Sequence, residues 1–237
     1  MISEDTKLSD IAFACYVYKI INDYDKAYIN FLNEVQGSLD LSNNKHRKAL
    51  LEWLNNWGCR QFAIKYHNEA SKSIENWYNI YSKKLRDYDI DIIHFDEKKA
   101  EFIGRAFEDL SKCFASYRIK KSGEKKKVTI GPTGATKILF AIKPNELMPW
   151  DGAIRSGKYN GTKESYIDFL NYVKMLCRSI EEKCKKHGYK LSDLPGIIDR
   201  EKSTIPKIID EYLWITKTRD FIPPTNAILE KWVEMSK

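Results

Sequence analysis

The sequence lacks the features that would place it in a membrane or on a secretory route. No apolar run approaches the roughly 18 residues that a membrane-spanning helix needs. The opening residues, MISEDTKLSD, are polar and acidic, whereas a secretory signal begins with a basic and then an apolar stretch. The mean hydropathy of -0.53 agrees with a water-exposed surface. We therefore expect a cytoplasmic protein that makes no contact with a membrane.

Cysteine and histidine are too scattered to build the sites that they usually form. The five cysteines are odd in number, which argues against a disulfide framework. Cys177 and Cys184 have a spacing found in some iron–sulfur ligand sets, but no further cysteines complete four thiolates. Both lie on an apolar stripe with helical spacing, so we expect small core residues. The four histidines form no paired ligand motif, and we expect neither a metal nor a cofactor.

The basic charge is carried mostly by lysine. The formal net charge is +7, and 31 lysines stand against 9 arginines. A basic surplus favours a polyanionic partner. Lysine suits phosphate as a point charge, whereas bidentate recognition of bases favours arginine. If nucleic acid is the partner, most of this charge should contact its backbone.

Apolar residues with helical spacing run through almost the whole chain. Ser42, Asp96 and Thr225 are suited to cap helices, and Pro206 suits a first turn. No GxGxxG fingerprint, P-loop, internal repeat or useful strand alternation interrupts the pattern. We predict an all-α, two-lobed helical bundle in one domain, 1–237, with lobes 1–117 and 128–237. The predicted helices cover about 6–36, 42–58, 62–81, 96–110, 163–187, 205–219 and 225–235.

The predicted connection between the lobes is strongly basic. Residues 118–127, RIKKSGEKKK, hold six basic side chains around a loop-forming Ser122-Gly123. A charge run of this kind is usually a solvated surface loop. It also leads directly into Gly131-Pro132-Thr133-Gly134, which favours a phosphate-facing arm beside a site. Both interpretations are open, and the second makes Lys125, Lys126 and Lys127 DNA-binding residues.

The segment GATKILFAIKPNELMPWDGAIR, residues 134–155, has the pattern of a site. Gly131 and Gly134 allow a tight turn with exposed amides, after which residues 135–137 begin a helix. Free amides at such a start can bind a DNA phosphate. The helix must end near Lys143-Pro144. Asp151 then stands at the N-cap of a short helix, 152–156, so the two helix starts can approach each other across the turn.

These residues resemble a known family of DNA repair enzymes. Gly134-Ala135-Thr136-Lys137, the apolar helix, Lys143-Pro144 and Pro149-Trp150-Asp151 are similar to the helix-hairpin-helix DNA glycosylases, most of all the 8-oxoguanine glycosylase branch. The similar stretch covers about residues 128–155. The resemblance implies a degenerate helix-hairpin-helix core. It also implies excision of a modified base from double-stranded DNA, without a required protein partner. Bacterial relatives of this branch include an anti-phage type, so defence against DNA with modified bases such as hypermodified cytosine is the expected setting.

The resemblance also implies roles for individual residues. Asp151 would stabilise positive charge on the sugar or orient water, and Lys137 would attack C1′, with strand cleavage as a possible second step. The phosphate contacts would come from Gly131, Thr133, Gly134, Thr136 and Arg155. A flipped base needs a stacking wall, for which the candidates are Phe140, Trp150 and Trp214.

Simpler explanations exist for each of these residues. Asp151 is a suitable plain N-cap, Lys137 a suitable solvated lysine at a helix start, and the three aromatic residues suit a core. The interval between Lys137 and Asp151 is shorter than in the family, which also leaves open a mechanism in which Asp151 acts with water alone. The alternative functions are repair of oxidised guanine and a non-catalytic DNA-binding helical module.

Overall fold

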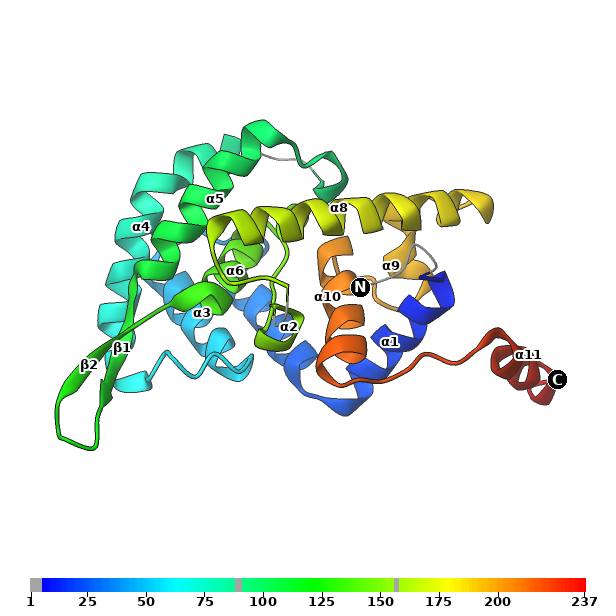
Figure 1. The fold of residues 1–237 in the computed structure, drawn as a ribbon, viewed down its shortest axis with the longest axis horizontal. Coiled ribbons are helices and arrows are strands. Elements are labelled where there is room, and N and C mark those ends of the chain that lie inside the picture. The colour runs from blue at the N-terminus through cyan, green and yellow to red at the C-terminus, as the bar shows by residue number, and fades with distance from the viewer. Residues whose placement is uncertain (1–5, 88–90, 156–157) are drawn as a thin grey trace.

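The computed structural model describes residues 6–87, 91–155 and 158–237, and it is mostly helical (Figure 1). The α-helices are α1 (Leu8–Ile21), α2 (Tyr24–Val35), α3 (Asn44–Asn56), α4 (His67–Asp87), α5 (Glu97–Lys112), α6 (Gly131–Ile142), α7 (Gly152–Arg155), α8 (Lys163–Lys186), α9 (Leu194–Ile197), α10 (Ile205–Leu213) and α11 (Asn226–Met235). Short 3-10 turns are η1 (Ile64–Tyr66), η2 (Ile92–His94) and η3 (Leu191–Asp193), and η4 (Trp214–Thr218) is a π-helix. The strands are β1 (Phe114–Ile119) and β2 (Lys125–Thr129).

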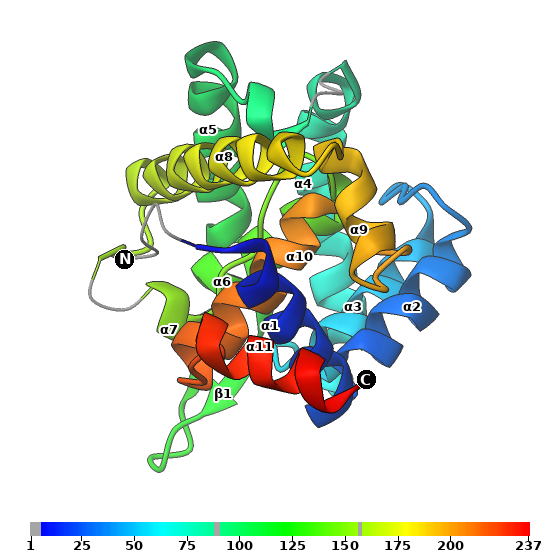
Figure 2. The ribbon, with the colours of Figure 1, turned by 90° about the vertical axis from the view of Figure 1, so that its right-hand side faces the viewer.

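The helices surround one continuous hydrophobic core. Apolar residues from Ile11 at one end to Ile215 at the other belong to a single buried cluster. Helix α6 lies at the centre, α8 crosses above it, and α1 packs beside α10 (Figures 1 and 2). The cysteines of the predicted apolar stripe, Cys177 and Cys184, are fully buried on α8, which confirms them as core residues.

Local capping explains where several helices begin. Asp96 accepts a hydrogen bond from Lys99 N–H at 3.0 Å, which confirms the predicted cap of α5. At α3 the prediction was wrong by one residue, because Asn43 rather than Ser42 accepts the capping bond, from Lys45 N–H at 2.9 Å. Such side-chain acceptors satisfy amides that have no partner within the helix.

The predicted helix 6–36 is interrupted at Asn22. Its backbone is extended, its side-chain amide donates to Tyr18 O at 2.7 Å, and its side-chain oxygen accepts from Tyr24 N–H at 2.9 Å. Asparagine competes in this way with the helical hydrogen bonds of its neighbours. The break separates α1 from α2 and brings Tyr18 and Tyr24 to the same pocket, described below.

The expected basic loop 118–127 forms the end of a two-stranded antiparallel ribbon: residues 118–119 and 125–127 lie in the strands, and 120–124 connect them. β1 pairs with β2 in the register Tyr117↔Lys127, Arg118↔Lys126 and Ile119↔Lys125. The ribbon projects from the helical body at the lower left of Figure 1. Residues 117–127 are all exposed, and apolar and polar residues alternate only over Tyr117-Arg118-Ile119-Lys120, so the segment carries a weak strand signal. Strand β2 is separated from α6 by a single residue, Ile130.

The C-terminal part of the chain forms α10, the π-helical turn η4 and a detached helix. α11 stands away from the body at the right of Figure 1, and none of its residues is buried. Residues 205–219 were predicted as one helix. Instead, α10 ends at Leu213, and from Trp214 the hydrogen bonding changes to the i→i+5 pattern of a π-helix. No helix within the described ranges is long and apolar enough to cross a membrane.

Candidate functional site

A pocket of about 240 Å³ lies where α6, α10, η4 and the start of α7 meet the first two helices. It is small beside the roughly 300–1,000 Å³ of sites for drug-sized ligands. Its walls combine aromatic rings with three ionisable side chains. The lining residues are Tyr18, Tyr24, Trp57, Gly58, Thr133, Lys137, Asp151, Gly152, Asp210 and Trp214.

Lys137 reaches the pocket from the second turn of α6. Its ammonium donates to Trp57 O at 2.6 Å and lies 4.8 Å from the centroid of the Trp57 ring. A carbonyl and an aromatic face both attract a cation, so they hold the amine at one place in the wall. The loop after α3 therefore fixes the position of Lys137.

Asp151 is held by both of its carboxylate oxygens. Oδ1 accepts a hydrogen bond from Ile154 N–H at 2.8 Å, which confirms Asp151 as the cap of α7. Oδ2 accepts one from the Thr218 hydroxyl at 2.7 Å. Thr218 ends the π-helical turn η4, a rare local structure that often occurs at functional sites. Two bonds from separate elements leave the carboxylate little rotational freedom.

Asp210 is a second acidic group of the pocket, and no sequence pattern had indicated it. Only 8 % of its surface is exposed. Burial is the main cause that raises the pKa of Asp210 to about 7. The charge of Asp151 raises this pKa further, whereas Lys207 and Lys137 lower it. Near neutral pH the pocket therefore holds one carboxyl group that is partly protonated.

Aromatic rings line the side of the pocket formed by η4. Trp214 packs edge-on against Tyr18 and Tyr24, with centroid distances of 5.4 and 5.8 Å. The Arg219 guanidinium lies 5.4 Å from the centroid of the Trp214 ring. Trp214 is therefore the predicted wall residue that the structure does place in the pocket.

A buried ionic cluster lies next to these rings. The Lys207 side chain is completely buried, donates to Glu211 Oε1 at 2.7 Å and lies 4.2 Å from the centroid of the Tyr18 ring. Arg200 is hydrogen bonded to Glu211 and pairs with both oxygens of Asp25. Charges removed from water in this way are tolerated because they compensate one another.

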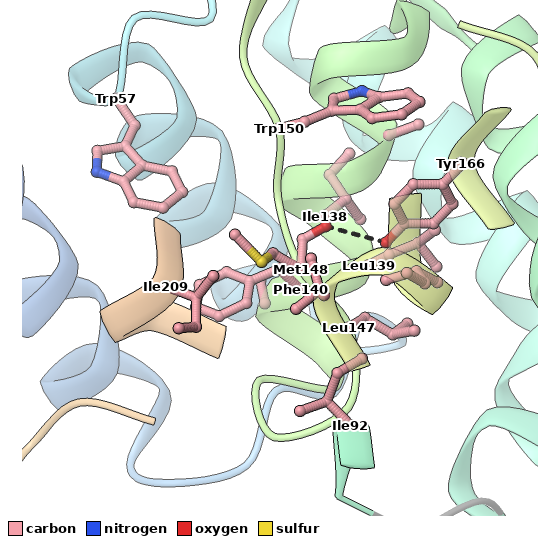
Figure 3. Packing of buried hydrophobic residues seen from close by; sticks show 14 of the residues in the cluster. Trp57, Ile92, Ile138, Leu139, Phe140, Leu147, Met148, Trp150, Tyr166 and Ile209 are labelled. Carbon is pink, nitrogen blue, oxygen red and sulfur yellow. Dashed lines mark hydrogen bonds between the residues drawn. The ribbon is translucent and has the colours of Figure 1, made fainter. Parts of the chain in front are cut away.

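Phe140 and Trp150 lie in the buried core rather than among the pocket residues (Figure 3). Thr136 is also completely buried. The Phe140 ring lies 6.1 Å from that of Trp57 and parallel to it, so it supports the wall from behind. Trp150 packs edge-on against Tyr166, whose hydroxyl donates to Met148 O. Phe140 is buried because it lies on the inward side of α6, and Trp150 because the short segment after α6 folds back into the core. We therefore remove Phe140 and Trp150 from the pocket wall.

The same burial changes the interpretation of the glycine-rich segment. α6 begins at Gly131, four residues earlier than predicted, so Thr136 and Gly134 lie within the helix and are both buried. Thr136 Oγ1 donates to Thr133 O at 3.1 Å and accepts from Trp150 N–H at 3.3 Å. A phosphate cannot reach this hydroxyl in the described structure.

Gly134 is needed for close packing. A Cβ at this position would lie 2.6 Å from Gln61 Nε2 and 2.9 Å from Ile130 Cγ2. Gln61 Nε2 also donates to Ile130 O at 2.9 Å. The absence of a side chain lets α6 approach the loop 57–62, which carries two residues of the pocket, Trp57 and Gly58.

The other residues that were predicted to contact DNA are accessible in the structure. Gly131 has a φ of +68° and open space around its Cβ position, and Thr133 lines the pocket. Arg155 is the last residue of α7 and is partly exposed. Lys125, Lys126 and Lys127 are exposed on β2. The structure thus brings Thr133, Lys137, Asp151 and Trp214 together, with the basic ribbon leading into the same helix.

Sequence reasoning missed Tyr18, Tyr24, Trp57 and Asp210. On a helix, aromatic residues of a pocket and of the core follow the same apolar periodicity, so spacing does not separate them. A possible signal for Asp210 was the charge within an apolar helix, since α10 places Lys207, Asp210 and Glu211 among buried isoleucine, tyrosine and leucine. Sequence spacing does not distinguish a buried charge from an exposed one.

A larger cavity, of about 690 Å³, lies between η2, η3 and the start of α10. Its acidic lining residues are Asp91, Glu181, Asp193 and Glu201, and Lys190 is its basic one. A mainly acidic wall repels phosphate, and none of the lining residues is aromatic. The smaller pocket is therefore the better candidate, because it combines the Lys137 amine, two carboxyl groups and aromatic rings.

Comparison with family models, curated proteins and solved structures finds no match for this chain. The functional conclusion consequently rests on the chemistry of the pocket and on the motif in the sequence.

Proposed function

We propose that this protein is a DNA glycosylase that flips a modified base out of double-stranded DNA and hydrolyses its N-glycosidic bond. The observation that carries the proposal is the meeting of Lys137, Asp151 and Trp214 in one small pocket. These residues come from α6, from the start of α7 and from η4, so only the fold brings them together. The glycosylase motif had named Lys137 and Asp151, and Trp214 was one of three candidates for the stacking wall.

The pocket walls suit a single extruded base. A base that leaves the helix loses its stacking partners, and enzymes replace them with aromatic side chains. Stacking on an aromatic ring contributes about 1–3 kcal/mol per base in single-stranded complexes. Trp214, Tyr24 and Trp57 supply aromatic surface around a volume of about 240 Å³.

Asp151 is suited to the charge that develops during cleavage. As the glycosidic bond breaks, its electron pair leaves with the base and positive charge builds on the sugar. A carboxylate that is already oriented stabilises this charge without reorganisation. The bonds from Ile154 and Thr218 provide that orientation.

Two mechanisms are open, and they differ in the role of Lys137. In the first, its amine loses a proton and attacks C1′, forming a covalent protein–DNA intermediate that leads to strand cleavage. In the second, Asp151 directs a water molecule to C1′, and the product is an intact strand with an abasic site. The 2.6 Å bond to Trp57 O favours the second version, because attack on C1′ requires the amine to leave that carbonyl.

Asp210 provides a source of protons for the departing base. A carboxyl group with a pKa of about 7 is partly protonated at neutral pH. General acids work best when their pKa lies near the working pH. The proposal assigns Asp210 to the base end of the pocket and Asp151 to the sugar end.

DNA would approach through the basic groups around the pocket. The first turn of α6, with Gly131 and Thr133, is suited to one phosphate, and Arg155 to another. On the ribbon, Lys126 adds a further positive charge, whereas Lys125 and Lys127 lie on the opposite face. The setting in defence against phage DNA, with hypermodified cytosine as a candidate base, derives from the family resemblance. Repair of oxidised guanine is the alternative within the same chemistry.

Mass spectrometry of bases released from plain, oxidised and phage-type modified duplexes tests the proposal. Release of a modified base by the wild-type protein, and its loss in Asp151→Asn, is the expected result. Release of oxidised guanine alone would favour the repair enzyme. Tight DNA binding without release from any duplex would instead identify a non-catalytic DNA-binding module.

A further inference from the structure

The ribbon β1–β2 has two faces of different character. Cross-strand partners share a face, so the register places Ser116, Arg118, Lys126 and Val128 on one side, here called the inner face. Tyr117, Ile119, Lys125 and Lys127 form the outer face. At the base of the ribbon the inner residue Ser116 is only 4 % exposed, whereas Tyr117 is 40 % exposed. The outer residue Tyr117 packs edge-on against Tyr66 of η1. The inner residue Ser116 instead faces the loop 57–62, because its hydroxyl donates to Gln61 O.

The base of the ribbon is fixed to the loop that borders the pocket. The Ser116 hydroxyl donates to Gln61 O at 2.6 Å, and Gln61 Nε2 donates to Ile130 O just beyond β2. Both strands are thus bonded to one residue of the loop 57–62, which carries Trp57 and Gly58 of the pocket wall. The direction of the ribbon is consequently coupled to the position of the pocket.

Two residues further along the inner face, Arg118 lies directly opposite Lys126. Like charges in directly opposite positions destabilise a ribbon. Lys120 is neutralised by Glu124 at 2.6 Å, but neither Arg118 nor Lys126 has an acidic group within 4.0 Å among the described residues. The free protein therefore keeps an unfavourable pair of cations at a defined place on the ribbon.

We propose that the inner face of the ribbon, through Arg118 and Lys126, binds the backbone of the DNA duplex next to the flipped base. The proposal rests on the proposed glycosylase function, since it places the duplex between the pocket and the ribbon. Phosphate supplies the negative charge that the pair lacks, and a two-stranded ribbon is narrow enough to enter the major groove. Lys125 and Lys127 point to the opposite side and contribute little to the same contact.

A matched pair of double variants tests this assignment. Arg118→Gln/Lys126→Gln and Lys125→Gln/Lys127→Gln each remove two positive charges from the same exposed ribbon. Dissociation constants are measured by fluorescence anisotropy on an unmodified labelled duplex over a series of salt concentrations. We expect the inner-face variant to bind on the order of tenfold more weakly, with a salt slope lower by about two. The outer-face variant should stay within about twofold of wild type.

Thermal melting separates a binding role from a structural one. Because the inner-face variant removes a repulsive pair, its melting temperature should equal or exceed that of wild type. Arg118→Lys keeps the charge and should retain the wild-type salt slope. Equal losses of affinity in the two double variants would overturn the inference, and so would unchanged affinity in both. The second result would assign the lysines to protecting exposed strand edges from aggregation.

Base release, measured on the same proteins, keeps this inference distinct from the proposed function. If modified bases are released but both double variants bind alike, the function stands and the ribbon assignment fails. If no duplex loses a base and the inner-face variant alone binds weakly, the ribbon assignment stands and the enzymatic function fails.

Discussion

Replacement of Asp151 by asparagine separates the charge of this residue from its structural role. The carboxylate accepts hydrogen bonds from Ile154 N–H and from the Thr218 hydroxyl. Asparagine can keep its oxygen on the amide of Ile154 and offer its NH₂ group to Thr218, whose hydroxyl then accepts. Two charge-assisted bonds become two neutral ones, at about 1 kcal/mol each. Asparagine also caps helices as well as aspartate does.

A second contribution offsets part of that loss. The charge of Asp151 raises the pKa of Asp210, so the two carboxylates repel each other when both are ionised. Removing the charge relieves this repulsion. We expect a net loss of about 1 kcal/mol in the free energy of unfolding. For a chain of this size, that corresponds to a fall of roughly 2–4 °C in the melting temperature.

The effect on base release should be much larger. Loss of one preoriented electrostatic group typically lowers the chemical rate by about 10²–10³. Single-turnover release of the modified base, with protein in excess, measures this rate without a contribution from product release. DNA affinity, measured on the same duplex, should remain within a few-fold of wild type.

Thr218→Val is the control, because it removes one hydrogen bond to Asp151 and leaves the carboxylate charge. We expect it to lower the rate of base release by less than about tenfold and the stability by about 1 kcal/mol. Excision by Asp151→Asn at close to the wild-type rate would refute the assignment. A comparable loss in both variants would mean that orientation, rather than charge, is what Asp151 provides.

Three further predictions concern the same pocket and its support. Borohydride added during turnover should trap a covalent protein–DNA adduct if Lys137 is the nucleophile, and Lys137→Gln should abolish it; continued base release without any adduct would support the water mechanism. Because burial raises the pKa of Asp210 to about 7, the folded protein binds this proton more tightly than the unfolded chain, so its stabilising effect is lost as pH rises from about 4 to 7. In urea unfolding, the free energy of unfolding of wild type should therefore fall by a few kcal/mol relative to that of Asp210→Asn as pH rises across that range. If the free energies of both proteins change with pH in parallel, the buried carboxyl group is contradicted. Gly134→Ala should displace Gln61 and cost about 1–3 kcal/mol in thermal melts, whereas Gly196→Ala, with open space at its Cβ position, should be close to neutral; equal effects would contradict the close packing of α6.

Helix positions and caps could be predicted where the decisive interactions are local. Asp96 and Asp151 cap the helices that follow them, as expected, because the bond is to an amide three residues away. The apolar stripe of α8 was also predicted correctly, since every one of its positions faces the core.

The ribbon could not be predicted in the same way. Polarity alternates only briefly in β1, from Ser116 to Ile119, and does not alternate in β2, which begins with three consecutive lysines. What forms the strands is backbone pairing of β1 with β2 and anchoring of Ser116 to Gln61. Neither depends on a residue pattern within the segment.

The sequence by itself determined a basic, mostly helical chain and a motif in which Lys137 and Asp151 follow a glycine-rich segment. The tertiary structure decided which side chains share the pocket. It selected Trp214 and left Phe140 and Trp150 in the core. It also added Asp210, whose pKa depends on burial and on charges from other elements. Burial and electrostatic environment arise from neighbours far apart in the chain, and for that reason residue type and spacing alone do not fix them.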